Sequence, residues 1–257
     1  MSVLDRLPSG RGDRALLAGV ACLLVGGLFA LTPLQAQLPS VLYVFIEVGI
    51  TFVIFGMLVL GLDLQYGHTG LVNFGHVVFF AVGAYATAML AAQDSFAGIS
   101  LGYPWPLALL VGVIAAALLG LVVSATSIRL RDDFLAIVTL ATAEIFHSIF
   151  VNFEGIFGGN VGILGVPRPI AAVAADTDTR MIATLLVIGG LTLITLAAVT
   201  RLTEAPYGRV LRAIRADELV TRSVGKSTIV YKTQAFVYGA ALAGLAGGVF
   251  ALYNGAV

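Results

Sequence analysis

Glu144 and His147 are the two residues whose types and spacing come closest to a chemically active pair in this sequence. They stand three positions apart, so on a helix both side chains would lie on one face. Glu-x-x-His pairs bind metal ions in di-metal helix bundles, but those sites need further ligands from neighbouring helices. The only other carboxylate placed well inside an apolar stretch is Glu47. The sequence therefore predicts no metal centre, no catalytic residue set and no bound cofactor.

Gly225-Lys226-Ser227 resembles the end of a Walker phosphate-binding loop. That loop requires a glycine five residues before Gly225, where this sequence has Val220. It also requires a preceding strand, whereas this segment has a helical pattern. We therefore expect that the chain does not hydrolyse ATP by itself and is not an enzyme.

The composition predicts an integral membrane protein. Of the 257 residues, 59% are apolar and 11% are charged, whereas a soluble domain has roughly 25% charged residues. So few charges could not cover the surface of a water-soluble domain of this size. Fourteen basic residues balance fourteen acidic ones, so no net field attracts polyanions. These values exclude a soluble enzyme, a disordered protein and a nucleic-acid binder.

Seven apolar stretches are long enough to cross the roughly 30 Å core of a bilayer as helices. They are continuous rather than alternating, which disfavours a β-barrel. The sequence thus predicts an all-α, polytopic membrane helix bundle that forms one domain over 15–257, after a short segment at 1–14. The predicted spans are Ala15–Leu34, Val41–Leu62, Phe74–Ala92, Pro104–Ser124, Phe134–Val151, Met181–Thr200 and Gln234–Tyr253.

Small residues recur at every fourth position in two of these spans, and such ladders let helices approach closely in a membrane. They are Gly112, Ala116, Gly120 and Ser124 in the fourth span, and Gly239, Ala243 and Gly247 in the seventh. The glycine-rich loop at 158–165 is expected to fold back tightly on the bundle, either facing an external partner or lining a vestibule.

The distribution of Lys and Arg predicts the side of the membrane that each loop faces. With the N-terminus in the cytoplasm, cytoplasmic segments hold twelve of the fourteen basic residues and external loops hold two. Seven of the twelve lie in 201–232, which is thereby placed in the cytoplasm, and 151–180 is placed outside. The basic leader would also suit a secretory signal, but Leu34-Gln35-Ala36 is a poor cleavage site.

This topology puts Glu144 about 15 Å from Phe134, near the membrane midplane, at about 1.5 Å per helical residue. A charge at that depth is costly and commonly faces a cavity or a partner. Two interpretations of Glu144 and His147 stay open, namely a hydrogen bond between helices and a place along a transport pathway.

Residues 201–232 are predicted to form two short amphipathic helices that meet at Ala216-Asp217. Pro206 suits the first turn of the first helix, and Asp217 can cap the second. Gly225 is a natural residue just after the end of the second helix.

Each of these two helices is predicted to have an apolar face. Val210, Leu211 and Ile214 form one in the first helix, beside a basic stripe. Val220 and Val224 form the other. The basic stripe consists of Arg209, Arg212 and Arg215. Binding to anionic lipid is one interpretation. Asp217 and Glu218 would face lipid headgroups unfavourably, so a groove in a protein partner is favoured.

Four stretches spread from about residue 60 to 255 form one combined pattern. They are GLDLQYGHTGLVNFGH at 61–76 with GAY at 83–85, LRDDFLAIVTL at 130–140 with AEI at 143–145, GGNVG at 158–162 with GVP at 165–167, and GR at 208–209 through AIRADE at 213–218 to Gly225, then AF at 235–236 and AGLAG at 243–247. Together they resemble the membrane subunits of ABC importers for branched-chain amino acids, a family that also includes urea and short-amide importers.

The resemblance implies a permease subunit of an ATP-driven importer in the plasma (inner) membrane, working by alternating access. The implied partners are two cytoplasmic ATP-binding subunits, a second homologous permease and an external solute-binding protein. The stretch 208–225 resembles the ATPase-docking loop of the family, with its acid at Glu218 and its glycine at Gly225. Val220-Thr221 stands where the family has an alanine pair. Arg212, Arg215 and Asp217 are expected to take part in the coupling loop, and Asn73 joins Glu144 and His147 as a candidate pathway residue.

An ion-coupled secondary transporter is the alternative, but it would need intramembrane ion ligands and an internal repeat. The sequence has few such ligands and no clear repeat. Members of the family tend to continue with further membrane helices, so the resemblance implies that a chain ending at Val257 is a truncated or incomplete subunit.

Overall fold

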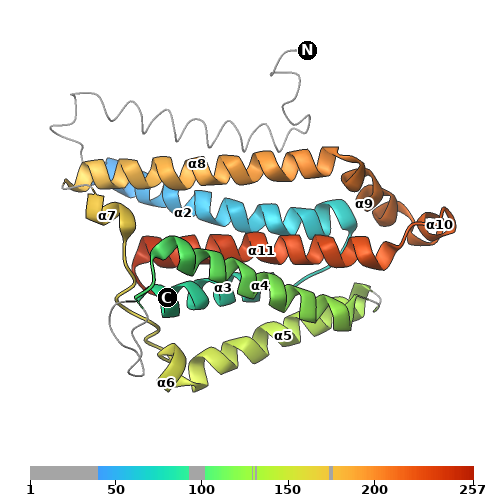
Figure 1. Cartoon of the computed structure of the whole chain (residues 1–257), viewed down its shortest axis with the longest axis horizontal. Helices are drawn as coiled ribbons and strands as arrows, with labels where there is room; N and C mark the ends of the chain where they lie inside the picture. Colours follow the sequence, from blue (N-terminus) through green and yellow to red (C-terminus); the bar gives the residue numbers. More distant parts are fainter. Residues whose placement is uncertain (1–39, 93–101, 129, 131, 174–175) are drawn as a thin grey trace, which may run out of the picture. The chain divides into compact units, whose positions relative to one another are not determined.

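The computed structural model describes residues 40–92, 102–128, 130, 132–173 and 176–257. Over these ranges every regular element is a helix, which confirms the all-α prediction (Figure 1). The elements are α2 (Ser40–Leu62), the π-helical turn η3 (Asp63–Gly67), α3 (His76–Ala91), α4 (Trp105–Ser127), α5 (Asp132–Asn152), α6 (Glu154–Phe157), α7 (Pro169–Val173), α8 (Thr177–Glu204), α9 (Pro206–Ala216), α10 (Glu218–Ser223) and α11 (Thr228–Asn254).

Five helical segments of the described chain are long and apolar enough to cross a membrane. They are Tyr43–Gly67, Trp105–Ser127, Asp133–Asn152, Thr179–Glu204 and Thr228–Asn254. They correspond to the second, fourth, fifth, sixth and seventh predicted spans. The first predicted span, Ala15–Leu34, lies outside the described residues. The total of seven spans and the cytoplasmic N-terminus therefore stay predictions.

The third predicted span, Phe74–Ala92, is helical over a shorter range than expected. Its helix, α3, has 16 residues, a length of about 24 Å at 1.5 Å per residue. That is shorter than the roughly 30 Å core of a bilayer. The chain from Gly70 to Gly75 is not helical, and Gly70 takes a positive φ of 78°. The apolar character of this region was predicted correctly, but the turn at its start was not.

The described residues form two compact units. The smaller contains residues 40–56, 170–173 and 176–200, and in it Thr192 of α8 donates a hydrogen bond of 3.5 Å to the carbonyl of Val53 in α2. The larger contains residues 57–92, 102–128, 130, 132–169 and 201–257. The prediction of one domain over 15–257 stays a prediction.

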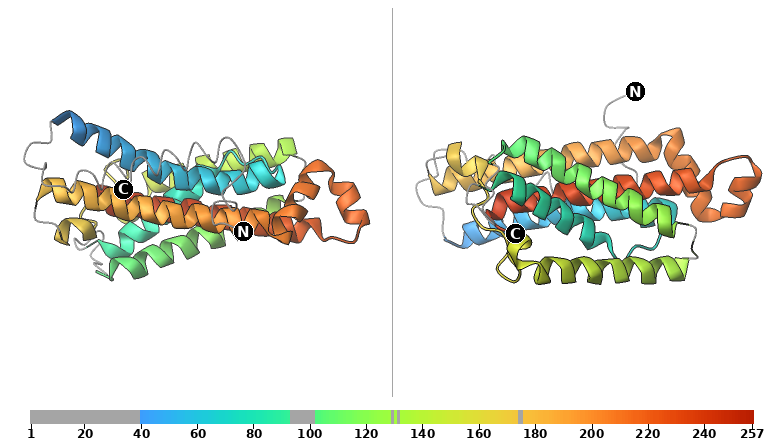
Figure 2. Two further views of the ribbon diagram at one scale, coloured as in Figure 1. Left: turned by 90° about the horizontal axis from the view of Figure 1, so that it is seen from above. Right: turned by 60° about the horizontal axis from the view of Figure 1, so that its bottom comes forward.

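In the larger unit, α11 packs along both α3 and α4, and α3 packs along α4 (Figures 1 and 2). The predicted small-residue ladders lie at these contacts, since all their residues are buried. A Cβ at Gly83 of α3 would collide with the backbone of Gly244, and one at Gly112 would collide with the backbone of Gly83. Only glycine permits this close approach of backbones.

The glycine-rich loop folds back on the end of α11, as predicted. Ile163 and Val257 exchange two backbone hydrogen bonds of 3.0 Å, and the amide of Val166 donates to the carbonyl of Gly255 at 3.1 Å. The side chains of Ile163 and Val166 are buried against the last turns of α11. The loop thereby joins the central three-helix packing of the larger unit.

Candidate coupling segment and pathway residues

The first helix of the predicted coupling segment, α9, begins at the predicted residue and buries its predicted apolar face. Pro206 occupies the first turn of α9. Leu211 and Ile214 are buried, and Leu211 packs in a small cluster with Leu64 of η3 and Ala235 of α11. Val210 is half-buried. The basic stripe of Arg209, Arg212 and Arg215 is exposed. The amphipathic character of α9 is therefore confirmed.

Two arginines of this stripe donate hydrogen bonds to backbone carbonyl groups elsewhere in the chain. Arg212 donates a hydrogen bond of 3.1 Å to the carbonyl of Thr203, at the end of α8. Arg215 donates to the carbonyl of Gly67, and its guanidinium lies 6.0 Å from the centre of the Tyr66 ring. Arg215 therefore links α9 to the π-helical turn η3.

The second helix, α10, has the predicted signals at both ends. The Asp217 carboxylate accepts a hydrogen bond of 3.0 Å from the amide of Val220, as an N-cap does. At the other end Gly225 has a φ of 80°. Its amide donates to the carbonyl of Arg222 at 2.9 Å, and the amide of Lys226 donates to the carbonyl of Thr221 at 3.4 Å. This pair of bonds is a Schellman motif, which favours glycine at Gly225.

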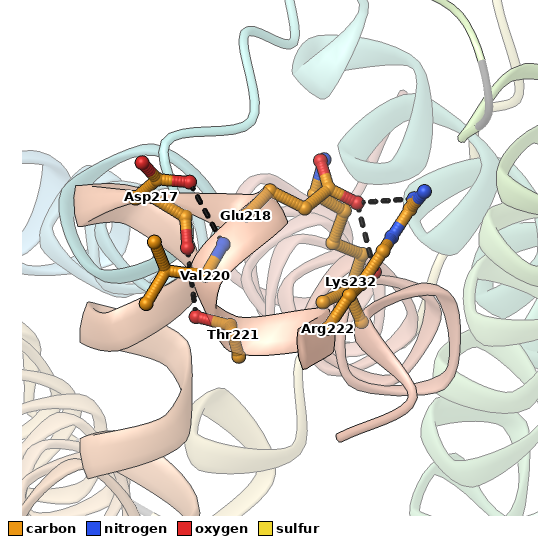
Figure 3. A network of polar contacts seen from close by, with 7 residues as sticks. Asp217, Glu218, Val220, Thr221, Arg222 and Lys232 are labelled. Atoms are coloured by element: carbon orange, nitrogen blue, oxygen red, sulfur yellow. Dashed lines mark hydrogen bonds and ion pairs between the residues drawn. The ribbon is translucent and has the colours of Figure 1, made fainter. Parts of the chain in front are cut away.

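Glu218 is bound from three sides within the chain (Figure 3). Its Oε1 atom accepts hydrogen bonds of 2.6 Å from Arg222 and 2.8 Å from the Thr228 hydroxyl. Its Oε2 atom accepts one of 2.6 Å from the Lys232 ammonium group. The Nε of Arg222 also donates to the Thr228 hydroxyl, at 2.9 Å. We call these four residues the Glu218 network.

The Glu218 network favours the ionised carboxylate. Partial burial by itself would raise the pKa of Glu218, but the hydrogen bonds from Lys232 and Thr228 and the charges of Lys232 and Arg222 lower it below the ordinary value of 4.5. The Lys232 side chain is 11% exposed and that of Glu218 is 29% exposed. A buried ammonium group requires such a partner, because an unpaired buried charge is costly.

Apolar side chains are exposed on α10 and at its C-cap, Val224. Leu219 is 76% exposed, and Val220 and Val224 are exposed as well. The predicted face of Val220 and Val224 is thus present and uncovered by the described residues. The sequence interpretation overlooked Leu219, although its position directly after Glu218 in a two-turn helix was a usable signal. It also overlooked the roles of Arg222, Thr228 and Lys232, for which the four-residue spacings 218–222 and 228–232 were the available signal.

Asn73 belongs to a second buried polar group. Its amide donates a hydrogen bond of 2.8 Å to the side-chain oxygen of Gln65 in η3, and its own oxygen accepts one of 3.0 Å from the amide of Gly75. Gln65 in turn donates to the carbonyl of Phe236 in α11 at 2.8 Å. Through Gln65, these contacts connect the turn before α3 to η3 and to α11. They do not bring Asn73 to Glu144 or His147, and its predicted place on a pathway stays a prediction.

Glu144 and His147 lie on α5 and are exposed. Glu144 lines a shallow groove together with four other residues of α5 and the residue that directly follows that helix. These are Ile145, Ser148, Ile149, Asn152 and Phe153. Only 17% of this span is buried inside the described chain. In the described residues no three His, Cys, Asp or Glu side chains group into a possible metal site. The predicted roles of Glu144 and His147 are not tested by this arrangement.

Several helices long and apolar enough to cross a membrane, joined by a polar helical segment, define a multi-pass membrane protein. Residues 44–257 match the family described as "Branched-chain amino acid transport system / permease component". The chain belongs to this family, which confirms the resemblance predicted from its sequence.

Three relatives support the same assignment. The chain is 35% identical over 233 residues to the "High-affinity branched-chain amino acid transport system permease protein LivM" of Salmonella typhimurium, and 34% identical over 233 residues to the protein of that name in Escherichia coli. Each match covers 82% of this chain and 53% of the relative. The "Probable branched-chain amino acid transport permease protein LivM" of Methanocaldococcus jannaschii is 27% identical over 228 residues, which cover 76% of this chain and 63% of the relative.

The chain spans about half the length of the two bacterial relatives that it matches. No solved structure matches it.

Proposed function

We propose that the chain is a permease subunit of an ATP-driven importer in the plasma (inner) membrane. Its cargo is a branched-chain amino acid or a related small polar solute such as urea or a short amide. Two cytoplasmic ATP-binding subunits, a second homologous permease and an external solute-binding protein complete the transporter. Family membership and the names of the relatives support the solute class.

The observation that carries the ATP-driven mechanism is the uncovered apolar face of α10. The helix has only six residues, and isolated helices shorter than about 12–15 residues are marginal in water. Its ends and its inner face are nevertheless fixed by the Asp217 cap, the turn at Gly225 and the Glu218 network. A rigid small helix that presents Leu219, Val220 and Val224 outward is suited to a groove in a partner. We assign that groove to the ATPase.

Reconstitution of the purified complex into vesicles tests this function. Uptake of radiolabelled leucine is expected to require ATP on the side that α10 faces, and to require the solute-binding protein on the other side. Urea and acetamide serve as the other candidate solutes. Uptake that persists without ATP and follows an ion gradient would instead identify a secondary transporter.

The cytoplasmic position of α10 has its own test. A cysteine at Asp217, in a chain where Cys22 is replaced by serine, is expected to resist a membrane-impermeant thiol reagent in sealed cells. A cysteine at Val161 is expected to react, because its loop is placed outside. Labelling of Asp217→Cys in sealed cells would overturn the orientation.

A further inference from the structure

We propose that Glu218 is a positioning residue that fixes α10 to α11, and that it is not a contact to the ATPase. This inference rests on the proposed function, since it assigns how motion at the docking helix reaches the membrane bundle. The acid of the segment would otherwise be expected on the docking surface, where a charge could select a partner. Its contacts in the structure point the other way, into the chain.

The geometry uses most of the binding capacity of the carboxylate. Glu218 accepts three hydrogen bonds, from Arg222 at 2.6 Å, Thr228 at 2.8 Å and Lys232 at 2.6 Å. Two of these donors, Thr228 and Lys232, lie one turn apart on α11 and so share a face of that helix. Three hydrogen bonds to one ionised group form a stiff connection, because charge-assisted bonds are shorter and stronger than neutral ones.

Burial shows which end of the connection is fixed. Lys232 is the more buried partner, with 11% of its side chain exposed, and the α11 residues that follow it, Ala235 and Phe236, are fully buried. The ammonium group is therefore held by the packed part of α11. Glu218 is the point at which α10 attaches to it.

The residues of α10 therefore have two different roles. Its outer residues, Leu219, Val220 and Val224, are free to contact a partner, while Glu218 transmits the displacement of α10 to α11. Because α11 packs along α3 and α4, a displacement at its first turn reaches the centre of the larger unit. Loss of the Glu218–Lys232 pair should thus uncouple transport from ATP hydrolysis and leave ATPase docking in place.

Charge reversal in the complete transporter complex tests this assignment. The variants are Glu218→Lys, Lys232→Glu and the double reversal, with two measurements: ATPase subunit recovered per permease, and leucine taken up per ATP hydrolysed. Each single reversal is expected to lower uptake per ATP by about tenfold or more, because it leaves a buried charge without its partner. The double reversal is expected to recover most of that loss. Rescue of Glu218→Lys by a change inside the same chain is not expected of a residue that contacts the ATPase.

A variant with two neutral substitutions, the neutral pair, controls for misfolding of the charge-reversal variants. Glu218→Gln with Lys232→Met removes both charges and leaves no buried ion unpaired. We expect wild-type ATPase recovery and an uptake per ATP lowered severalfold. Lys226→Met, which removes an exposed lysine of the same segment, is the matched control and should behave as wild type.

The possible results separate the two levels of the proposal. If Glu218→Lys loses the ATPase while Lys232→Glu and the neutral pair match wild type, Glu218 is a docking residue and the positioning role is wrong. The role is equally wrong if the neutral pair keeps wild-type uptake per ATP. In both cases the wild-type complex still shows ATP-dependent uptake, so the proposed function stands. A wild-type complex without ATP-dependent uptake would remove both.

Discussion

Helices α10 and α5 both expose apolar side chains, but they differ in how their charged side chains are placed. In α10 both charged residues, Glu218 and Arg222, are paired within the chain, while apolar residues led by Leu219 are exposed. In α5 apolar residues such as Ile137 are exposed, and so is the charged residue Glu144. An exposed apolar or charged side chain has different consequences in the two helices, because α5 is a candidate membrane span and α10 is not.

An apolar face in a membrane-spanning helix needs no protein partner, since lipid covers it. A carboxylate at the same depth does need one, or a polar cavity. In a water-facing segment charges are well solvated and need no partner, whereas an exposed apolar cluster marks a contact surface. The unexplained groups are therefore Glu144 in α5 and Leu219 with its neighbours in α10. We propose that each one marks a place where this chain meets a partner or a polar cavity.

Replacement of Glu144 tests the role of the exposed charge on α5. If Glu144 lines the solute pathway, Glu144→Gln should lower leucine uptake by about tenfold or more, the effect of losing about 1.4 kcal/mol in the transport step. The amount of assembled complex should stay at the wild-type level, because the volume of the side chain is kept. Uptake and complex yield are measured together.

Glu154→Gln is the matched control for that variant, because Glu154 is an exposed acid in α6, just after the span. Parallel loss of yield and uptake in Glu144→Gln would identify a structural hydrogen bond between helices. Normal uptake in Glu144→Gln would remove the pathway role.

The next prediction concerns the turn at the end of α10. Gly225 has open space around it, so a substitution there is resisted by its φ of 80° and not by steric contact. Gly225→Val should destabilise the turn by about 1–3 kcal/mol, because a β-branched residue is strained in this conformation. Gly225→Asn should stay close to wild type, since asparagine tolerates the left-handed region. Hydrogen exchange of the Lys226 amide reports the turn directly. Equal exchange in both variants would contradict this account.

The smallest effect is the pH dependence of the Glu218 network. The pKa of Glu218 is lowered below 4.5 in the folded chain, so its ionised form contributes stability that is complete above 4.5 and is lost as the pH falls through the folded value. Hydrogen exchange of α10, corrected for the intrinsic rate, should be constant from about pH 5 to pH 8 and rise only in stronger acid. Glu218→Gln should lack the acid transition. A transition in α10 above pH 5 would show that other groups control the helix.

Local signals in the sequence were sufficient for the α9–α10 part of the fold. Pro206, Asp217 and Gly225 each act on the backbone within one turn, so their effects can be predicted without the rest of the chain. The same holds for the five long apolar helices, whose continuous apolar stretches have no other stable arrangement in a bilayer.

The remaining features depend on residues distant in sequence. The contacts of Glu218 with Thr228 and Lys232 were not predicted, because they arise only when α10 folds against α11. The π-helical turn η3 was not predicted. Its Gln65 is held by Asn73 and by the carbonyl of Phe236, 171 positions away. Periodicity along one helix carries no information about such contacts.

Recovery of the ATPase per permease reports whether the apolar face of α10 binds the ATPase. Val224→Asp places a charge on that face without touching a membrane span, and Val161→Asp is the matched control, because the two valines are 73% and 71% exposed. We predict that Val224→Asp lowers ATPase recovery by at least about tenfold, the effect of losing about 1.4 kcal/mol of binding. Val161→Asp should leave that recovery unchanged. Equal recovery of the ATPase with both variants and the wild type would contradict the account.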